Sequence, residues 1–307
     1  MPIIEVDQLG KSYGRTVAVS DVSFSVEPGE IFGILGPNGA GKTTTVECLV
    51  GLRRRDGGRV RVLGVDPDVD RATVRSHVGI QLQQAELPER ITVTEALRLY
   101  SSFYPQPADW RELLDALGLA GAARTQFGRL SGGQQQRLSI ALALIGNPQV
   151  AVLDELTTGL DPAARRETWQ LIEQVRDRGV TIVLVTHFMP EADHLCDRLA
   201  VIDRGTVVAL DTPAGLVGRL DAGQRMRFRP SRPIDDALLT DLPEVWSVTR
   251  RGAEVIVDGD AELITAVTAT LARVGAVAER LRVEQASLDD AFIAVTRHDT
   301  RSEEGSR

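Results

Sequence analysis

The sequence predicts an α/β fold with a mostly parallel central sheet, and three observations lead to that prediction. A short apolar run at residues 30–35 is followed by a glycine-rich segment and then by a helical pattern. Two further apolar strands, at residues 150–153 and 181–185, are separated by a helical pattern at 163–178. Such alternation of apolar strands with helices is typical of a parallel sheet covered by helices.

The N-terminal part of the chain favours an antiparallel β portion beside that core. Residues 3–8 and 17–26 alternate in polarity around a turn at 11–14, which is typical of strands. Residues 59–63 and 77–82 are expected to form two more strands. The first of them is bounded by glycines.

Residues 92–145 favour helices instead of strands. Within this stretch, Asp109 is suited to cap a helix that carries an apolar stripe, and Gly118 is suited to end it. The sequence therefore predicts a helical subdomain inserted into the α/β core, with bounds at about 84–147.

The composition changes near residues 221–224, after two short predicted strands at 199–203 and 207–210. Beyond that point the pattern predicts a small α+β unit without a recognisable catalytic motif. Its predicted elements, in order, are a strand at 225–229, a helix at 234–241, strands at 245–251 and 253–258, a helix at 261–274, a strand at 278–283 and a helix at 288–295. The predicted domains are residues 1–222 and 223–296, followed by a flexible tail at 297–307.

The charge, the cysteines and the absence of long apolar runs in the sequence argue against a protein that binds nucleic acid, holds a metal through cysteines or spans a membrane. The 307 residues have a formal net charge of −8, which gives no overall electrostatic reason to expect a nucleic acid partner. Cys48 and Cys196 lie in apolar patterns without metal-ligand spacing and are expected to be reduced core thiols. The N-terminus lacks a signal-peptide pattern, and no apolar run reaches the roughly 18 residues of a spanning helix. We therefore expect a chain that is soluble by itself.

The segment GPNGAGKTT at residues 36–44 matches the phosphate-binding loop pattern in full. Its glycines let backbone N–H groups surround a polyphosphate, and the helix that follows adds its positive N-terminus. Lys42 is expected to reach the β- and γ-phosphates, and the Thr43 hydroxyl to bind Mg²⁺. A glycine-rich turn that binds nothing is the alternative, but only Lys11 and Lys42 among the 35 basic residues are lysines, which favours a nucleotide site. The predicted nucleotide-binding residues of the loop are Gly36, Pro37, Asn38, Gly39, Ala40, Gly41, Lys42, Thr43 and Thr44.

A second glycine-containing segment, LSGGQ at residues 130–134, precedes another predicted helix. Its glycines permit a close approach of the backbone, Ser131 supplies a hydroxyl, and the helix directs its positive end forward. The segment, called the signature segment below, is thus a second candidate phosphate-binding terminus. Standing alone, it would be better explained as an ordinary serine N-cap followed by flexible glycines.

Three polar side chains are predicted at strand ends. Asp154 and Glu155 end the apolar strand at 150–153, and His187 follows the strand at 181–185. Asp154 is suited to a contact with Mg²⁺, and Glu155 to positioning or deprotonating an attacking water. At the carboxyl edge of a parallel sheet, His187 would face the same crevice as the phosphate-binding loop. Paired acids and a single histidine are often only solvated, so the prediction depends on the loop.

Taken together, these motifs resemble the ATP-binding-cassette (ABC) transporter ATPases. The phosphate-binding loop, the signature segment, VAVLDE at 150–155, GLDP at 159–162 and TH at 186–187 occur in the order of that family. The continuation after His187, and SLDDAF at 287–292, look like the drug- and polysaccharide-exporter branch, above all its daunorubicin-type ATPases.

The resemblance implies further site residues. Tyr13 would stack on adenine, and Gln83 would join the Mg²⁺ site to the helical subdomain, although glutamines at 81, 83 and 84 leave its register open. Asp161 would cross to a partner subunit. Ser131, Gly132, Gly133 and Gln134 would hold the ATP of that other subunit, so a complete site needs two chains. The chain departs from the family at Leu156, where proline is usual, which is expected to alter rigidity and not chemistry.

The resemblance therefore implies an ATPase with ATP and Mg²⁺ as cofactors, whose catalytic residues are Glu155, His187, Gln83 and Lys42 and whose metal ligands are Thr43, Gln83 and Asp154. It is expected to form a dimer, most simply a homodimer, and to power a separate membrane exporter of a drug-like, antibiotic or lipid-like compound from the inner face of the membrane. Two alternatives are a soluble cassette ATPase acting on ribosomes or DNA, and a nucleotide-gated clamp.

Overall fold

The computed structural model describes residues 1–81, 87–219, 223–284 and 286–304, the last eight of them by their backbone alone. The described chain forms two compact units, Met1–Pro213 and Ala214–Arg307. None of its described helices is both long and apolar enough to cross a membrane.

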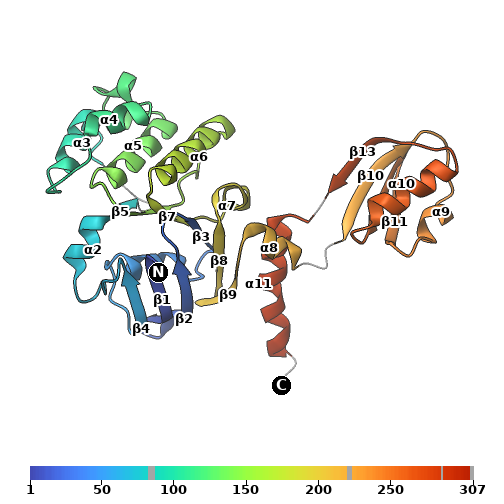
Figure 1. Ribbon diagram of the computed structural model, residues 1–307, viewed down its shortest axis with the longest axis horizontal. Coiled ribbons are helices and arrows are strands. Elements are labelled where there is room, and N and C mark those ends of the chain that lie inside the picture. Colours follow the sequence, from blue (N-terminus) through green and yellow to red (C-terminus); the bar gives the residue numbers. More distant parts are fainter. Residues whose placement is uncertain (82–86, 220–222, 285, 305–307) are drawn as a thin grey trace. The chain divides into compact units, whose positions relative to one another are not determined.

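A nine-stranded sheet organises the first unit (Figure 1). Its strands stand in the order β4-β1-β2-β9-β8-β3-β7-β6-β5. Their bounds are β1 Ile4–Tyr13, β2 Thr16–Val26, β3 Ile31–Leu35, β4 Gly57–Val62, β5 Val78–Gln81, β6 Val150–Asp154, β7 Thr181–Val185, β8 Arg198–Asp203 and β9 Thr206–Asp211.

The strands β8, β3, β7, β6 and β5 run parallel to one another and form the core of this sheet. Every residue of β3, β6 and β7 is buried, which explains why these strands are apolar without interruption. The pairs β1–β2, β1–β4 and β8–β9 are antiparallel. The predicted fold class, a mostly parallel core with an antiparallel N-terminal portion, is confirmed.

Seven helices are described in the first unit before its boundary. They are α1 Lys42–Leu49, α2 Arg71–His77, α3 Val93–Ser101, α4 Trp110–Ala116, α5 Gly132–Leu144, α6 Pro162–Asp177 and α7 Met189–Leu195, with short 3₁₀ turns at 120–122 and 127–129. The helices α3, α4 and α5 pack together as the inserted helical subdomain (Figure 1). The helices α2 and α7, of seven residues each, were not predicted from the sequence.

Side chains at the helix ends explain why the subdomain is helical. Asp109 caps α4 by accepting a hydrogen bond from the backbone of Arg111, and Gly118 follows the helix with a φ of +63°. Thr92 and Glu95 form a capping box at the start of α3. The predicted N-cap and stop of α4 are therefore confirmed.

The second unit is a four-stranded antiparallel sheet with helices. Its strand order is β11-β12-β10-β13, and its sequence of elements, β-α-β-β-α-β, gives a ferredoxin-like arrangement. Met226, Phe228 and Val257 of the sheet pack on Leu263 and Val267. The elements are α8 Pro213–Gly218, which spans the boundary, β10 Gln224–Pro230, α9 Ala237–Thr240, β11 Val245–Arg251, β12 Glu254–Gly259, α10 Leu263–Arg273, β13 Ala278–Glu284 and α11 Leu288–Glu304. Each element predicted after residue 224 has a counterpart here, but α11 continues to Glu304, so residues 297–304 of the predicted flexible tail are helical.

Gly79 lets the strand β5 approach the helix α5 closely. A Cβ atom at this position would lie 2.0 Å from the carbonyl oxygen of Ala143, which belongs to the helix that follows the signature segment. A backbone atom cannot move aside as a flexible side chain can, so only glycine fits. The helical subdomain is thus packed against the sheet at a point where no side chain is tolerated.

We expect Gly79→Ala to destabilise the first unit by about 1–3 kcal/mol, because the added methyl group forces β5 and α5 apart. The matched control is Gly121→Ala, where the added Cβ has nothing within 4 Å. Thermal unfolding of the full chain should show a lower melting temperature for Gly79→Ala and an unchanged one for Gly121→Ala. Equal melting temperatures for the two variants would show that β5 and α5 can separate without cost.

Candidate functional site

The glycine-rich loop between β3 and α1 packs closely against the backbone of β8 and β2. A Cβ atom on Gly36 would lie 2.2 Å from the carbonyl oxygen of Ile202, and one on Gly41 would lie 2.3 Å from that of Ala18. Gly41 is also the N-cap of α1, with a left-handed φ of +102°. Glycine is therefore required at both positions, and the loop leaves its backbone open to a ligand at the start of a helix.

Lys42 is the first residue of α1, and its side chain turns back over the loop. Its ammonium donates hydrogen bonds to the carbonyl oxygens of Gly36, at 2.8 Å, and Pro37, at 3.0 Å. Burial lowers the pKa of Lys42, whereas the charges of Glu155 and Asp154 raise it. Since both carbonyls are neutral, an anion on the loop would bind this ammonium more strongly than they do.

The other predicted residues of the loop differ in exposure. Asn38, Gly39 and Thr43 are exposed, Thr44 is half-buried and Ala40 is buried. The Thr43 hydroxyl is thus accessible beside Lys42, as a ligand of a cation bound at the loop has to be.

Asp154 ends β6 as a buried carboxyl group. Burial and, to a smaller extent, the neighbouring charge of Glu155 raise its pKa to about 6, although Lys42 acts in the opposite direction. Its backbone N–H donates to the Gln81 side chain at 3.1 Å. A buried carboxylate that is poorly solvated gains from a nearby cation, so this position fits a Mg²⁺ ligand or an outer contact to one.

Glu155 and His187 are in direct contact. The Nδ1 atom of His187 lies 3.0 Å from Oε1 of Glu155, and the backbone N–H of Glu155 donates to the carbonyl of Val185 at 2.8 Å. Glu155 has a φ of +51°, which is uncommon for a residue with a side chain and typical of a functional site. An ionised carboxylate only accepts hydrogen bonds, so the Nδ1–H of His187 donates to it.

The parallel strands explain why these groups meet. Val185 of β7 pairs with Ile34 of β3 on one side and with Asp154 of β6 on the other. The glycine-rich loop, His187 and the Asp154–Glu155 pair therefore all follow the carboxyl ends of three adjacent strands. Ligands of open α/β sheets bind at this edge.

Tyr13 is the last residue of β1, and 43% of it is exposed. The Lys11 ammonium lies 5.5 Å and the Arg53 guanidinium 6.0 Å from the centre of its ring. Asp56 binds Lys11 at 2.8 Å, and Glu47 of α1 binds Arg53 at 2.9 Å. The tyrosine is thus an exposed aromatic ring with fixed cationic neighbours, which the sequence did not reveal.

The signature segment and Asp161 form the second half of the candidate site. Ser131 caps α5 in a capping box with Gln134, and Asp161 caps α6 by accepting from Ala163 and Ala164 at 2.9 and 3.1 Å. The two helix starts line one cavity of about 420 Å³. Within the described chain, its lining includes Ser131, Gly132, Gly133, Gln134 and Asp161, and no residue of the glycine-rich loop.

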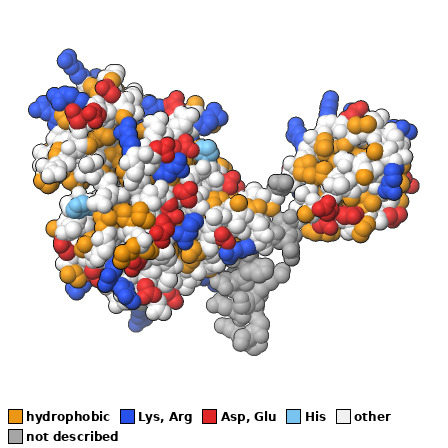
Figure 2. All heavy atoms as spheres, viewed as in Figure 1, with side chains coloured by type: hydrophobic (Ala, Val, Ile, Leu, Met, Phe, Trp, Pro, Cys, Tyr) orange, Lys and Arg blue, Asp and Glu red, His pale blue; other side chains and the backbone are white. Residues whose placement is uncertain are grey.

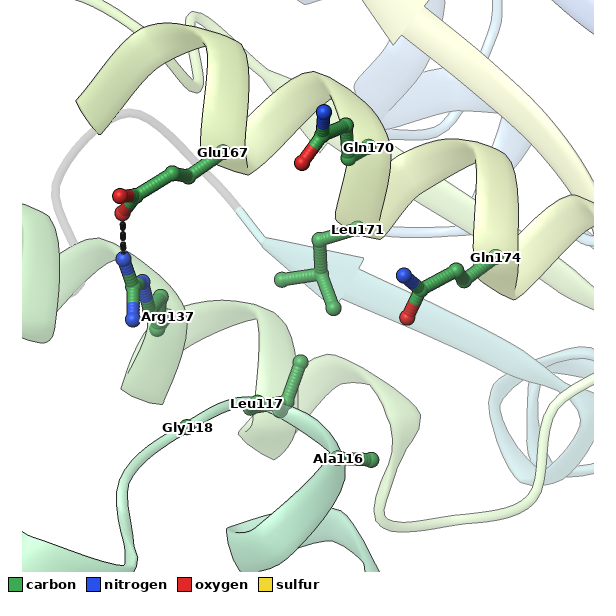
Figure 3. Close-up of a pocket in the computed structure, with 8 residues that line it drawn as sticks. All are labelled: Ala116, Leu117, Gly118, Arg137, Glu167, Gln170, Leu171 and Gln174. Atoms are coloured by element: carbon green, nitrogen blue, oxygen red, sulfur yellow. Dashed lines mark hydrogen bonds and ion pairs between the residues drawn. The ribbon is translucent and has the colours of Figure 1, made fainter. Parts of the chain in front are cut away.

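A neighbouring cavity of about 270 Å³ lies between α5, α6 and residues 116–118 (Figure 3). Arg137 of α5 and Glu167 of α6 form an ion pair across its edge, and Leu171 points into it. A Cβ atom on Gly118 would lie 3.1 Å from the Arg137 guanidinium. This ion pair links the two helices whose first turns carry the signature segment and Asp161.

Two further positions singled out from the sequence are Gln83 and Leu156. Gln83, the predicted Mg²⁺ and subdomain residue, lies in the segment 82–86, outside the described residues. Leu156, which stands where the family usually has proline, is fully buried and follows Glu155 directly. The hydrogen bond between Gln81 and Asp154 was not predicted. The sequence does not show which of the glutamines at 81, 83 and 84 lies at the end of the strand.

Comparisons with known proteins identify the family of this chain. The ABC transporter family model matches residues 19–158. The daunorubicin/doxorubicin resistance ATP-binding protein DrrA of Streptomyces peucetius is 35% identical over 323 aligned positions, which cover 98% of this chain and 95% of that protein. Nod factor export ATP-binding protein I of Rhizobium etli is 40% identical over 225 positions, which cover 72% of this chain and 71% of that protein.

Solved structures give the same result. The ATP-binding subunit of an ABC transporter superposes with a TM-score of 0.64 at 27% identity, covering 71% of this chain and 92% of that one. A dimeric post-hydrolysis state of an ATP-binding cassette, bound to ADP and phosphate, gives a TM-score of 0.62 at 28% identity and covers 68% of this chain and 98% of that one. The chain thus belongs to the ABC transporter family, as an ATP-hydrolysing, nucleotide-binding subunit.

Proposed function

We propose that the chain hydrolyses Mg-ATP to power a separate membrane exporter of a drug-like, antibiotic or lipid-like compound. The contact between Glu155 and His187, beside the glycine-rich loop, is the observation that carries hydrolysis. Export is supported by the two relatives, one named for daunorubicin and doxorubicin resistance and one for Nod factor export. The resemblance to the resistance protein extends over nearly the whole chain and so includes the second unit.

ATP binds, in this proposal, along the path from Tyr13 to the start of α1. Tyr13 stacks on adenine, and the backbone N–H groups of residues 36–44 surround the phosphates. Lys42 exchanges its neutral carbonyl partners for the β- and γ-phosphates. Thr43, Asp154 and Gln83 hold Mg²⁺, which neutralises charge on the phosphates when it is bound.

Hydrolysis requires that water be aligned with the γ-phosphate. Glu155 accepts the proton of the attacking water, and its left-handed backbone conformation interrupts the extended strand that precedes it. His187 fixes the Glu155 carboxylate through Nδ1 and keeps Nε2 for the γ-phosphate. Lys42 and the signature segment of a second subunit stabilise the negative charge of the transferring phosphoryl group.

Two copies of the chain are needed for each complete site. The cavity at the signature segment and Asp161 is lined by no residue of the glycine-rich loop within the described chain. A head-to-tail homodimer supplies the signature segment of one copy to the ATP of the other, and a solved relative is dimeric in its post-hydrolysis state. In the closed arrangement, the N-terminus of α5 faces the phosphates of the partner's ATP.

The helical subdomain offers a surface for the membrane subunit. Leu99 of α3 is 46% exposed, and Phe103, which follows this helix, is 65% exposed. The rings of Phe103 and Tyr100 lie 5.6 Å apart and extend the same apolar surface. We infer that the cytoplasmic part of the exporter packs here and holds the chain at the inner face of the membrane.

A soluble cassette that acts on ribosomes or DNA is the second candidate, and the findings favour it less. The chain carries a net charge of −8, and Figure 2 shows acidic and basic side chains interspersed on the visible face. A clamp that is merely gated by nucleotide is also disfavoured, because both Glu155 and His187 are present and in contact.

Glu155→Gln should lower ATP hydrolysis by about 10²–10⁴-fold, since the amide cannot accept the proton of water. The variant should still bind Mg-ATP and should form a stable dimer, as seen by ATPase assays and size-exclusion chromatography with ATP. The matched control is Glu112→Gln, an exposed carboxylate of α4 that should leave the rate unchanged. Hydrolysis at the parent rate by Glu155→Gln would assign the proton transfer to another group.

The double variant Leu99→Ser, Phe103→Ser should lose its membrane partner and keep its ATPase activity. The measurement is co-purification from native membranes with tagged Glu155→Gln protein, Mg-ATP and salt washes, looking for a stoichiometric membrane protein with many spans. Val69→Ser is the control, because Val69 is exposed but lies in a turn away from α3. Retention of the partner by the double variant would move the docking surface elsewhere, and capture of ribosomes or DNA would favour the second candidate.

A further inference from the structure

The helices α6 and α7 contact one another along a row of polar and aromatic side chains. This row, called the α6–α7 seam below, has no assigned part in nucleotide binding or hydrolysis. The residues of α6 repeat at intervals of four and those around α7 at intervals of three, so each set lies on one face. The seam consists of Arg165, Trp169 and Glu173 from α6 and of Phe188, Glu191 and His194 from α7 and its N-cap.

The far end of the seam is fixed by a buried carboxylate. The indole N–H of Trp169 donates to Oε1 of Glu191 at 3.2 Å, and Glu191 is fully buried. The imidazole of His194 packs on the Trp169 ring with centroids 4.8 Å apart, and its Nε2 lies 3.8 Å from Glu173. Breaking this hydrogen bond would leave a buried carboxylate without the donor, which costs free energy. The bond between Trp169 and Glu191 therefore holds α7 in one position against α6.

The near end of the seam lies next to the catalytic residues. The Arg165 guanidinium lies 4.2 Å from the centre of the Phe188 ring, and Phe188 directly follows His187. The same guanidinium donates to the carbonyl oxygen of Leu160 at 3.4 Å. Arg165 therefore touches both the residue after His187 and the residue before Asp161.

The start of α7 has no side-chain cap of its own, although the Thr186 hydroxyl accepts a hydrogen bond from the backbone N–H of Phe188 at 3.0 Å. Phe188 is the N-cap residue of α7 and offers no side-chain acceptor to its first turn. By contrast, Asp161 caps α6 with two hydrogen bonds to backbone N–H groups. Arg165 thus adds a side-chain contact at the uncapped start of α7, and His187 stands at this junction.

We propose that Arg165 and Phe188 are positioning residues that hold the His187 imidazole against Glu155. Through Arg165, the placement of His187 also depends on the loop that ends at Asp161. The inference rests on the role proposed above for His187. It adds that this role requires the α6–α7 seam.

The test begins with Arg165→Ala and Phe188→Leu in the full chain. Loss of the cation–π contact should lower the kcat for ATP hydrolysis by about 3- to 10-fold. The KM for ATP should change by less than about 2-fold, because the glycine-rich loop and Tyr13 are untouched. Phe188→Tyr keeps an aromatic face and should retain the parent kcat. The control is Arg176→Ala in the last turn of the same helix, since Arg176 pairs with its neighbour Asp177.

A double-mutant cycle with His187→Ala separates positioning from a general loss of structure. If Arg165 acts through His187, then Arg165→Ala should cause no further loss of single-turnover rate once His187 is absent. The same fold-loss in both backgrounds, or no loss in either, would overturn the seam proposal. Full activity of His187→Ala would instead refute the role of His187 itself. Thermal unfolding shows whether each variant is folded. If Arg165→Ala is unfolded, the same cycle is carried out with Phe188→Leu, which keeps an apolar side chain.

Discussion

The register of three parallel strands is the constraint on which the site depends. Val185 of β7 stands between Ile34 of β3 and Asp154 of β6, and adjacent strands in a sheet are only about 4.8 Å apart. The glycine-rich loop, the acidic pair and His187 are brought together by this pairing before any side-chain contact is made. A slip by one residue would turn Asp154 to the opposite face of the sheet. The uninterrupted burial of all three strands prevents such a slip.

Burial also gives the site its electrostatic character. The Lys42 ammonium and the Asp154 carboxyl group are both withdrawn from water, which lowers the pKa of the first and raises that of the second. Each group is therefore held in its charged form less well than in solution. In the proposed complex, a bound anion would favour the charged form of Lys42 and a bound cation that of Asp154, so the two parts of Mg-ATP would offset both effects of burial.

Much of the fold and part of the site could be predicted from the sequence. Motif spacing located Asp154, Glu155 and His187 at strand ends, and Asp109 revealed the start of α4. The helix α7 escaped prediction because it has only seven residues and no N-cap side chain, whereas the equally short α4 was recognised from its cap. The left-handed backbone of Glu155 and the contact of Gln81 with Asp154 arise from tertiary packing, which local residue patterns do not encode. The roles of the site residues remain predictions.

The capping box at the start of α5 has a consequence for how readily two copies separate. In the single chain, Ser131 and Gln134 already satisfy each other's backbone N–H groups at 3.3 and 3.0 Å. A phosphate arriving from a partner gains only the difference between a charge-assisted hydrogen bond and the internal one that it replaces. The signature segment therefore gains less free energy from binding the partner's phosphate than an uncapped helix start would. In the proposed dimer, such an interface can open again after each round of ATP hydrolysis, as repeated transport requires.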